Sequence, residues 1–345
     1  MIKPLDDMAL PETLAKPQPG HFRAVWYHGN ATITIEDGPM MAADAANFDN
    51  PVVMRGLFSG ISRGTERLVF TGKVPASEHQ RMRCPHQDGV FGGPVKYGYA
   101  MIAECIDGPL EMQGRPGFVL HPHQTGFTVP ADDVHLLPEA LPPKRACLIA
   151  NMETALNILW DSHASAGDRI LVVGGGVLGL LVTALAAGLP GAGLTLCDPV
   201  AERAALADLF GAAFCTPDQA PDGQDVVIHV SGNPAGLETA LNAAGYEARV
   251  VEASWYGDRP VSVPLGGAFH SQRLSLVSSQ VGGIPADRRG RWTYRRRLAT
   301  AMQLLCDDRF DHLITGEIAF DDAAAAMPSV FADDADGLMT VIRYP

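Results

Sequence analysis

The stretch PVKYGYAMIAEC, residues 94–105, places a lysine and two tyrosines beside a glycine at the start of an apolar run. A phenol can donate a proton, and a nearby ammonium group favours its ionised form, so we expect Lys96 to lower the pKa of Tyr99. Both side chains would then face a substrate. Packing at a strand edge is the alternative, and nothing within the stretch decides between the two.

A second stretch, ILVVGGGVLGLL, has the spacing of a loop that binds phosphate groups. Gly174, Gly176 and Gly179 form GxGxxG directly after an apolar strand and at the start of a helical segment. Such glycines permit a tight turn and the close approach of a diphosphate, whose charge the helix N-terminus favours. Asp198 ends the next apolar segment, close to the spacing of the acid that binds a dinucleotide's ribose. A glycine-rich turn in a domain without nucleotide is the alternative.

A carboxylate at Asp198 would bond the adenosine ribose hydroxyls and repel a 2′-phosphate, so we expect NAD rather than NADP. Arg203 follows shortly afterwards and could cover the adenine, which would soften this discrimination. The expected cofactor contacts come from this loop and from polar positions near it: Gly174, Gly176, Val177, Leu178, Gly179, Asp198, Arg203, Ser231 and Thr154.

The segments that must position these residues show two different sequence patterns. From about 22 to 145, short apolar runs broken by glycine and proline indicate a mostly β region. From about 170 to 280, runs rich in valine, isoleucine and leucine alternate with helical segments, which is typical of a parallel sheet covered on both faces. We therefore expect an α/β chain with a catalytic domain over 1–150, a nucleotide-binding domain over 151–287, and a return to the catalytic domain over 288–345.

The bulk composition narrows the partners. A net charge of −13 argues against nucleic acid or an anionic membrane. No apolar run reaches the roughly 18–20 residues of a membrane span, and the N-terminus lacks a signal-peptide pattern. The 6 cysteines are scattered without CxxC, which favours a reduced, cytoplasmic protein. The arginine-rich segment 287–297 is expected to be a solvated helix face.

Several motifs together resemble the medium-chain dehydrogenases/reductases, a superfamily that includes alcohol dehydrogenase-like enzymes. They are SGISRGTE (59–66), PVKYGYAMIAEC (94–105), ETALN (153–157), GGGVLG (174–179), DVVIHVSGNPAGLETAL (225–241) and ITGEIAF (314–320). The resemblance implies a doubly wound Rossmann sheet plus a mostly β, GroES-like catalytic domain. It also implies a homodimer that pairs through the segment LSLVSSQVGG (274–283) at the edge of the cofactor-domain sheet.

Within that superfamily, SGISRGTE and KYGY look most like the branch of the bacteriochlorophyllide dehydrogenases. Zinc-dependent members carry Gly-His-Glu where this chain has Gly98-Tyr99-Ala100. Their cysteine ligands would fall at Ser62 or Arg63 and at Ala150 or Asn151. None of these residue types suits zinc, so the resemblance implies a zinc-free site.

A metal bound elsewhere is the alternative to a site without metal. His121 and His123 would lie on one face of a strand, and Cys84 and His86 have a similar spacing. These four side chains could equally line a polar pocket.

Without zinc, a substrate oxygen still needs a hydrogen-bond or proton donor. Thr65 matches the position of the hydroxyl relay in the zinc-dependent relatives, although it and Glu66 could instead organise the turn. His123 is expected at the pocket rim and Glu153 near the nicotinamide. The catalytic candidates are Thr65, Tyr99, Lys96, Glu66, Glu153 and His123.

The expected function is an NAD(P)-dependent oxidoreductase that interconverts a secondary alcohol and a ketone by hydride transfer, acting on a small molecule. One alternative is the reduction of an activated C=C bond, as in zinc-free enoyl and quinone reductases. The other is nucleotide binding without turnover, since a Rossmann fold does not by itself specify catalysis.

Overall fold

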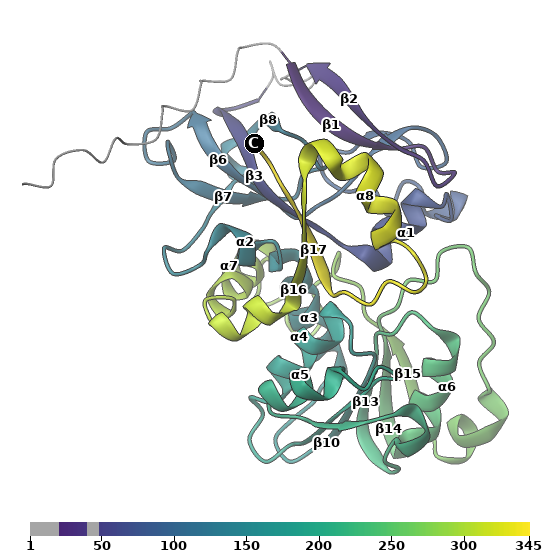
Figure 1. The fold of residues 1–345 in the computed structure, drawn as a ribbon. Helices are drawn as coiled ribbons and strands as arrows, with labels where there is room; N and C mark the ends of the chain where they lie inside the picture. Colours follow the sequence, from purple (N-terminus) through teal and green to yellow (C-terminus); the bar gives the residue numbers. More distant parts are fainter. Residues whose placement is uncertain (1–20, 40–47) are drawn as a thin grey trace, which may run out of the picture.

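The computed structural model describes residues 21–39 and 48–345. The described chain forms two parts, one built mainly from strands and one from a parallel sheet with helices (Figure 1). The fold confirms the expected class, a Rossmann-like parallel sheet together with a mostly β domain.

The mostly β part contains two sheets. The smaller has the order β2-β1-β5-β4, and the larger has the order β16-β17-β3-β6-β7-β9, with β8 also paired to β3. The strands from the first half of the chain are β1 (His21–Tyr27), β2 (Ile33–Pro39), β3 (Pro51–Ile61), β4 (Asp88–Gly89), β5 (Val95–Lys96), β6 (Met101–Asp107), β7 (Pro116–Val119), β8 (Gly126–Pro130) and β9 (His135–Leu136). The short helix α1 (Arg63–Phe70) follows β3 directly.

The second part has a parallel sheet of order β12-β11-β10-β13-β14-β15. Its strands are β10 (Arg169–Val173), β11 (Gly193–Cys197), β12 (Ala213–Cys215), β13 (Gln224–His229), β14 (Ala244–Glu252) and β15 (Ser275–Ser278). Its helices are α3 (Ile149–Ser162), α4 (Val177–Ala186), α5 (Arg203–Leu209) and α6 (Pro234–Ala243), and the short α2 (Pro143–Ala146) precedes them. Helices α3, α4 and α5 share one apolar core with the sheet, and α6 packs into another, so both faces are covered.

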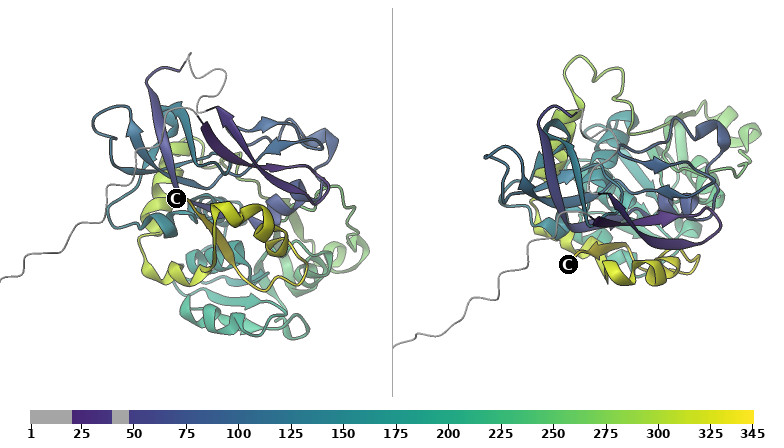
Figure 2. Two further views of the ribbon diagram at one scale, coloured as in Figure 1. Left: turned by 45° about the horizontal axis from the view of Figure 1, so that its top comes forward. Right: turned by 90° about the horizontal axis from the view of Figure 1, so that it is seen from above.

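The C-terminal elements are α7 (Tyr294–Leu304), β16 (Ile314–Ala319), α8 (Ala323–Val330) and β17 (Met339–Arg343). Of these, the two strands and the second helix return to the first part. Strand β17 pairs antiparallel with β3, and α8 lies against β2, while α7 packs on α3. Figure 2 shows from two further directions that α8 and β17, drawn in yellow, lie against the purple strands of the first part.

The apolar cores join the two parts. One core continues from β6 and β7 through α3 into the buried face of the parallel sheet, and it includes Ile102, Phe118, Met152 and Val172. A separate core fills the mostly β part around Tyr27 and the inner face of β3. Within the described ranges, no helix combines the length and apolarity needed to cross a membrane.

Strand β15 lies at one edge of the parallel sheet and carries the partly exposed side chains of Leu276 and Val277. An unpaired apolar edge attracts a further strand, so we expect this edge to pair with a second copy of the chain. Light scattering at micromolar concentration should then give the mass of a dimer. Val277→Lys, which places a charge on the edge, should shift that mass towards the monomer, and a monomeric wild type would contradict the prediction.

Candidate active site

The phosphate loop connects β10 to α4 in a tight turn. Gly174 has a φ of +116°, and a Cβ atom added at Gly179 would lie 1.8 Å from the Gly174 carbonyl oxygen. The helix therefore approaches the strand more closely than any side chain would allow. A Cβ atom added at Gly176 would meet nothing within 4 Å, so this glycine borders open space.

These features fit a dinucleotide diphosphate. Leu180 donates its amide to the Gly176 carbonyl at 3.0 Å as the α4 hydrogen bonds begin. The amides at the start of a helix lack partners within it, and they attract an anion. The sequence-predicted contacts Val177 and Leu178 lie in this first turn.

Asp198 follows β11 and holds the loop from the side. Its carboxylate accepts the Gly175 amide at 2.5 Å and the Val200 amide at 2.9 Å. It remains partly exposed, and each oxygen has a further lone pair for a ribose hydroxyl. Asp198 therefore combines support of the phosphate loop with a position suited to the adenosine ribose.

The segment 333–337, between α8 and β17, bridges the two parts of the protein. Arg63 at the start of α1 donates to the Ala335 carbonyl at 2.7 Å, and Arg203 at the start of α5 donates to the Asp336 carbonyl at 2.7 Å. Burial and the neighbouring charge of Arg203 lower the pKa of Arg63, so the two guanidinium groups are close. The first turn of α1 is thus linked to the end of the parallel sheet where Asp198 follows β11.

Three hydroxyl groups meet beside that turn. Tyr99 donates to Ser62 Oγ at 2.5 Å, and Thr65 also hydrogen-bonds the Tyr99 hydroxyl. All three side chains are partly exposed. The sequence predicted roles for Thr65 and Tyr99, but it gave Ser62 only as a possible metal position. The signal that could have found Ser62 is the family resemblance, which matches both Tyr99 and Ser62 or Arg63 to ligands of one metal ion.

Ser62 Oγ is free to bond Tyr99 because it does not cap α1, and the Ser62 amide is bound by another side chain. Ser62 precedes α1 without capping it, and the Glu66 carboxylate accepts the Ser62 amide at 2.7 Å. Glu66 thus bonds the main chain at this turn, which is the alternative role expected for it. The same carboxylate accepts the Tyr27 hydroxyl at 2.6 Å and lies 2.9 Å from His123 Nε2.

The expectation that His123 lies at a pocket rim is wrong. His123 and Glu66 are both completely buried, and His123 Nδ1 lies 2.7 Å from Ser59 Oγ, which in turn bonds the Tyr344 hydroxyl. A buried polar group costs stability unless it is hydrogen-bonded, so this chain of partners accounts for both residues within the core.

The expected effect of Lys96 on Tyr99 is also wrong. Strand β5 pairs Lys96 with Trp26, and the ammonium group donates to Gln124 Oε1 at 3.1 Å. Burial instead raises the pKa of Tyr99 to about 12, although the hydrogen bonds with Ser62 and Thr65 oppose the shift. Tyr99 is therefore a protonated hydrogen-bond donor at neutral pH.

Glu153 lies in α3 and forms a buried ion pair. Arg297 of α7 donates to Glu153 Oε1 at 2.9 Å and to Asn157 Oδ1 at 2.6 Å. Arg297 is 2% exposed, so the arginine-rich segment is not solvated throughout. Thr154 donates to the Ala150 carbonyl within the helix at 2.9 Å. Asn151, in the first turn of α3, keeps a buried Oδ1 atom without a partner among the described residues.

The residues at the family's metal positions do not fit zinc. Ser62 and Tyr99 present hydroxyls that bond each other, and Ala150 or Asn151 would stand at the third position. His121 stacks on Phe127, and its Nδ1 bonds the Pro122 carbonyl. Over residues 21–39 and 48–345, no group of three histidine, cysteine or acidic side chains is placed to hold a metal ion.

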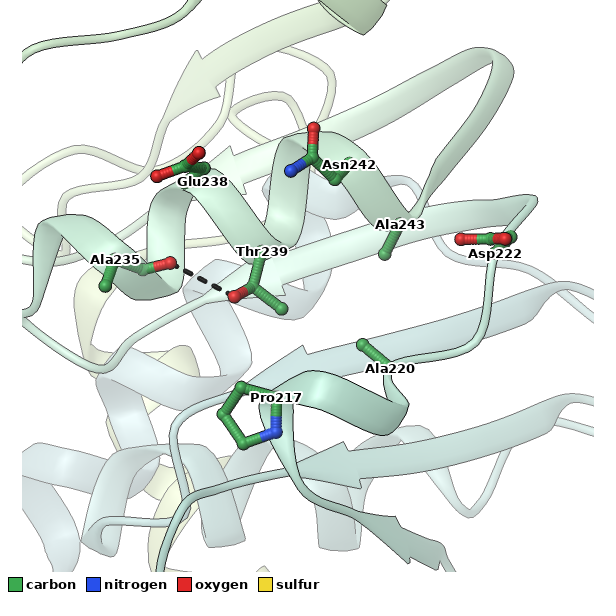
Figure 3. A pocket seen from close by; sticks show the side chains of 8 residues that line it. All are labelled: Pro217, Ala220, Asp222, Ala235, Glu238, Thr239, Asn242 and Ala243. Carbon is green, nitrogen blue, oxygen red and sulfur yellow. Dashed lines mark hydrogen bonds between the residues drawn. The ribbon is translucent and has the colours of Figure 1, made fainter.

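A groove lies on the outer side of the parallel sheet, between α6 and the turn after β12 (Figure 3). Its lining includes Asp222 and Glu238, whose charges would repel a phosphate. Thr239 does not point a free hydroxyl into it, since that group bonds the Ala235 carbonyl at 3.1 Å. The phosphate loop does not line this groove, so we do not assign the cofactor to it.

No protein-family model matches the chain. It is 29% identical over 302 residues to the 2-dehydro-3-deoxy-L-galactonate 5-dehydrogenase of Pseudoalteromonas atlantica, covering 75% of this chain and 83% of that enzyme. It is 25% identical over 197 residues to the D-guloside 3-dehydrogenase of Escherichia coli, covering 52% of this chain and only 56% of that enzyme.

Solved structures share the fold. A protein of Escherichia coli CFT073, described as a short chain alcohol dehydrogenase and complexed with NADH, aligns with a TM-score of 0.72 at 17% identity. The alignment covers 94% of this chain and 99% of that one. Together these similarities support the medium-chain dehydrogenase/reductase superfamily for this chain. Within the superfamily fold, the phosphate loop and the Ser62–Tyr99 pair occupy the two parts of the molecule that Arg63 and Arg203 bring together.

The protonation of Tyr99 gives a first test. The folded protein holds the phenolic proton more tightly than the unfolded chain does, so Tyr99 should ionise near pH 12 instead of near pH 10. Ionisation therefore removes stability only as the pH rises above about 10. The difference in absorbance at 295 nm between wild type and Tyr99→Phe should show this midpoint, and a midpoint below about 10 would contradict the assignment.

Asp198 gives a test of cofactor choice. Asp198→Asn keeps an oxygen for the Gly175 amide but removes the charge, so it should weaken NAD binding and narrow the preference over NADP. A charge-assisted hydrogen bond contributes about 1.5–3 kcal/mol, which corresponds to roughly tenfold or more in affinity. Calorimetric titration of both cofactors measures this, and tighter binding of NADP by the wild type would refute the prediction.

Proposed function

We propose that the protein is an NAD(P)-dependent oxidoreductase that transfers hydride between the nicotinamide and a carbon bearing a hydroxyl or carbonyl group. The observation that carries this proposal is the bridge made by segment 333–337, whose neighbouring carbonyls bind Arg63, next to Ser62, and Arg203, shortly after Asp198. This bridge brings the Ser62–Tyr99 pair towards the end of the sheet where Asp198 supports the phosphate loop. A dinucleotide seated on that loop would extend along the edge of the sheet, as in other doubly wound folds.

The cofactor would accept or supply the hydride, and the protein would manage the substrate oxygen. Tyr99 is a neutral donor whose proton points to Ser62 Oγ. A substrate oxygen that enters beside Ser62 could take over that hydrogen bond. Ser62 and Thr65 would then orient the oxygen. When a ketone is reduced, the oxygen would take the Tyr99 proton and Tyr99 would regain one from solvent, and in alcohol oxidation the hydroxyl proton would leave to solvent by the same partly exposed hydroxyl groups.

The substrate that we propose is a secondary alcohol of a sugar or polyol, or the matching ketone. The names of the curated relatives support this. They are the D-guloside 3-dehydrogenase, the 2-dehydro-3-deoxy-L-galactonate 5-dehydrogenase and, in Emericella nidulans, a protein named "Probable D-xylulose reductase A". Clustered hydroxyl side chains also suit a polyhydroxylated ligand. The likeness of SGISRGTE and KYGY to bacteriochlorophyllide dehydrogenases makes a tetrapyrrole alcohol the second substrate to test.

Turnover assays separate the alternative functions. Reduction of NAD by a panel of polyols supports the proposal. Turnover of enoyl or quinone substrates alone would instead identify a C=C reductase. Tight cofactor binding without turnover on any substrate would identify a nucleotide-binding protein.

The Tyr99 hydroxyl should dominate the rate. Tyr99→Phe removes one oxygen and keeps the ring packing, and the loss of one such donor typically costs about 10²–10³ in kcat. Tyr246→Phe is the matched control, because Tyr246 is 67% exposed and should leave the rate unchanged. An unchanged kcat in Tyr99→Phe would show that the Tyr99 hydroxyl does not contribute to catalysis and that the side chain only packs.

We propose that catalysis is independent of zinc, because the available donors are hydroxyl and amide groups. Purified protein should carry well under one zinc ion per chain, and a chelator should change neither activity nor melting temperature. Elemental analysis measures the metal content directly. Stoichiometric zinc would overturn this part of the mechanism.

A further inference from the structure

Three side chains at the ends of β13 and β14 form a hydrogen-bonded series. His229 Nε2 lies 2.7 Å from Ser231 Oγ, and His229 Nδ1 lies 2.8 Å from Glu252 Oε2. The histidine side chain is completely buried, whereas Ser231 is exposed. The series therefore links a hydroxyl at the surface to a charge behind it.

The partners of Glu252 fix the direction of the series. Its carboxylate also accepts the Ser254 amide at 2.7 Å and the Tyr256 hydroxyl at 3.1 Å. Although burial opposes ionisation, hydrogen bonds from His229 and Ser254 lower the pKa of Glu252 overall. An ionised carboxylate only accepts, so neutral His229 must carry its proton on Nδ1.

That tautomer determines what Ser231 offers to solvent. Unprotonated Nε2 accepts the Ser231 hydroxyl proton, and Ser231 Oγ accepts the Asn233 amide at 3.1 Å. One lone pair of Ser231 Oγ is then left facing outward. Ser231 therefore presents an acceptor, which suits a ligand hydroxyl and disfavours an anion.

Ser231 stands directly beside the phosphate loop. A Cβ atom added at Gly174 would lie 2.8 Å from the Ser231 backbone nitrogen. Asp198 follows β11, and Ser231 follows β13, so the two lie on opposite sides of β10. A dinucleotide whose adenosine ribose meets Asp198 would place its second ribose on the side of Ser231.

We propose that His229 and Glu252 are positioning residues that hold Ser231 Oγ as a hydrogen-bond acceptor for a hydroxyl of the nicotinamide-side ribose. The inference rests on the proposed cofactor but concerns residues that act behind the contact surface. It also explains the small residue at Gly236, where a Cβ atom would lie 2.5 Å from Ser231 Oγ and 2.7 Å from His229 Nε2.

Glu252→Gln changes the shape of the side chain very little, but it should reverse the direction of the hydrogen bonds from residue 252 through His229 to Ser231. The Ser254 amide is a fixed donor, so the glutamine oxygen must face it and the NH₂ group must face His229 Nδ1. His229 would then carry its proton on Nε2 and donate to Ser231 Oγ, which would use up the outward lone pair. Glu247→Gln is the matched control, because Glu247 lies on the same strand in an exposed pair with Arg273.

The experiment is calorimetric titration of the full-length protein with NAD, ADP-ribose and ADP. Ser231→Ala and Glu252→Gln should each weaken NAD and ADP-ribose about 3- to 10-fold, the value of one neutral hydrogen bond. Binding of ADP, which lacks the second ribose, should not change. Glu247→Gln should bind all three ligands as the wild type does.

Nitrogen-15 NMR of labelled histidine tests the tautomer separately. The wild type should show the His229 proton on Nδ1, and Glu252→Gln should move it to Nε2. A wild-type proton on Nε2, unchanged NAD affinity in both variants, or an equal loss for ADP would each overturn the inference. A wild type that binds none of the three ligands would overturn the proposed function itself.

Discussion

The buried carboxylate of Glu66 is the constraint on which the candidate site depends. It lies in the core of the mostly β part and has no exposed surface. A buried carboxyl group is tolerated only with several hydrogen-bond partners, and Glu66 has Tyr27, the Ser62 amide and His123. Meeting that requirement fixes the start of α1 against β1. The position of Ser62 Oγ beside Tyr99 is a consequence.

The parallel sheet imposes a second constraint, from the other side of the molecule. Because every strand from β10 to β15 runs in the same direction, the carboxyl ends of all six strands lie at the same end of the sheet. The loop after β10, Asp198 after β11, Ser231 after β13 and Glu252 at the end of β14 all gather there. Buried strands thus bring together polar groups from widely separated positions along the chain.

The sequence predicted the features that depend on local pattern. Glycine spacing after an apolar strand predicted the phosphate loop, and the next strand end predicted Asp198 as a ribose contact, because both expectations follow from short-range geometry. The fold class followed from the change in texture along the chain. Ser62 could have been assigned a role, since it is one of the two residues, with Arg63, at which the family resemblance places a cysteine ligand.

Other parts of the site depend on contacts between distant segments. The partners of His123 and Glu153 come from Ser59, Glu66 and Arg297, and no spacing rule connects them. Lys96 and Tyr99 are close in sequence, but their side chains bind different partners, Gln124 and Ser62. The same limit applies to His229 and Glu252, which only the register of β13 and β14 brings together.

The bridge made by segment 333–337 has a consequence for how the protein tolerates change. Arg63 and Arg203 bind the carbonyl oxygens of Ala335 and Asp336, which are atoms of the main chain. Replacing the side chain of Ala335 or Asp336 leaves these carbonyl acceptors in place. Inserting or deleting a residue between α8 and β17 would shift both carbonyls at once. Homologous chains should therefore keep the length of this segment, whereas the residue types at positions 335 and 336 can vary.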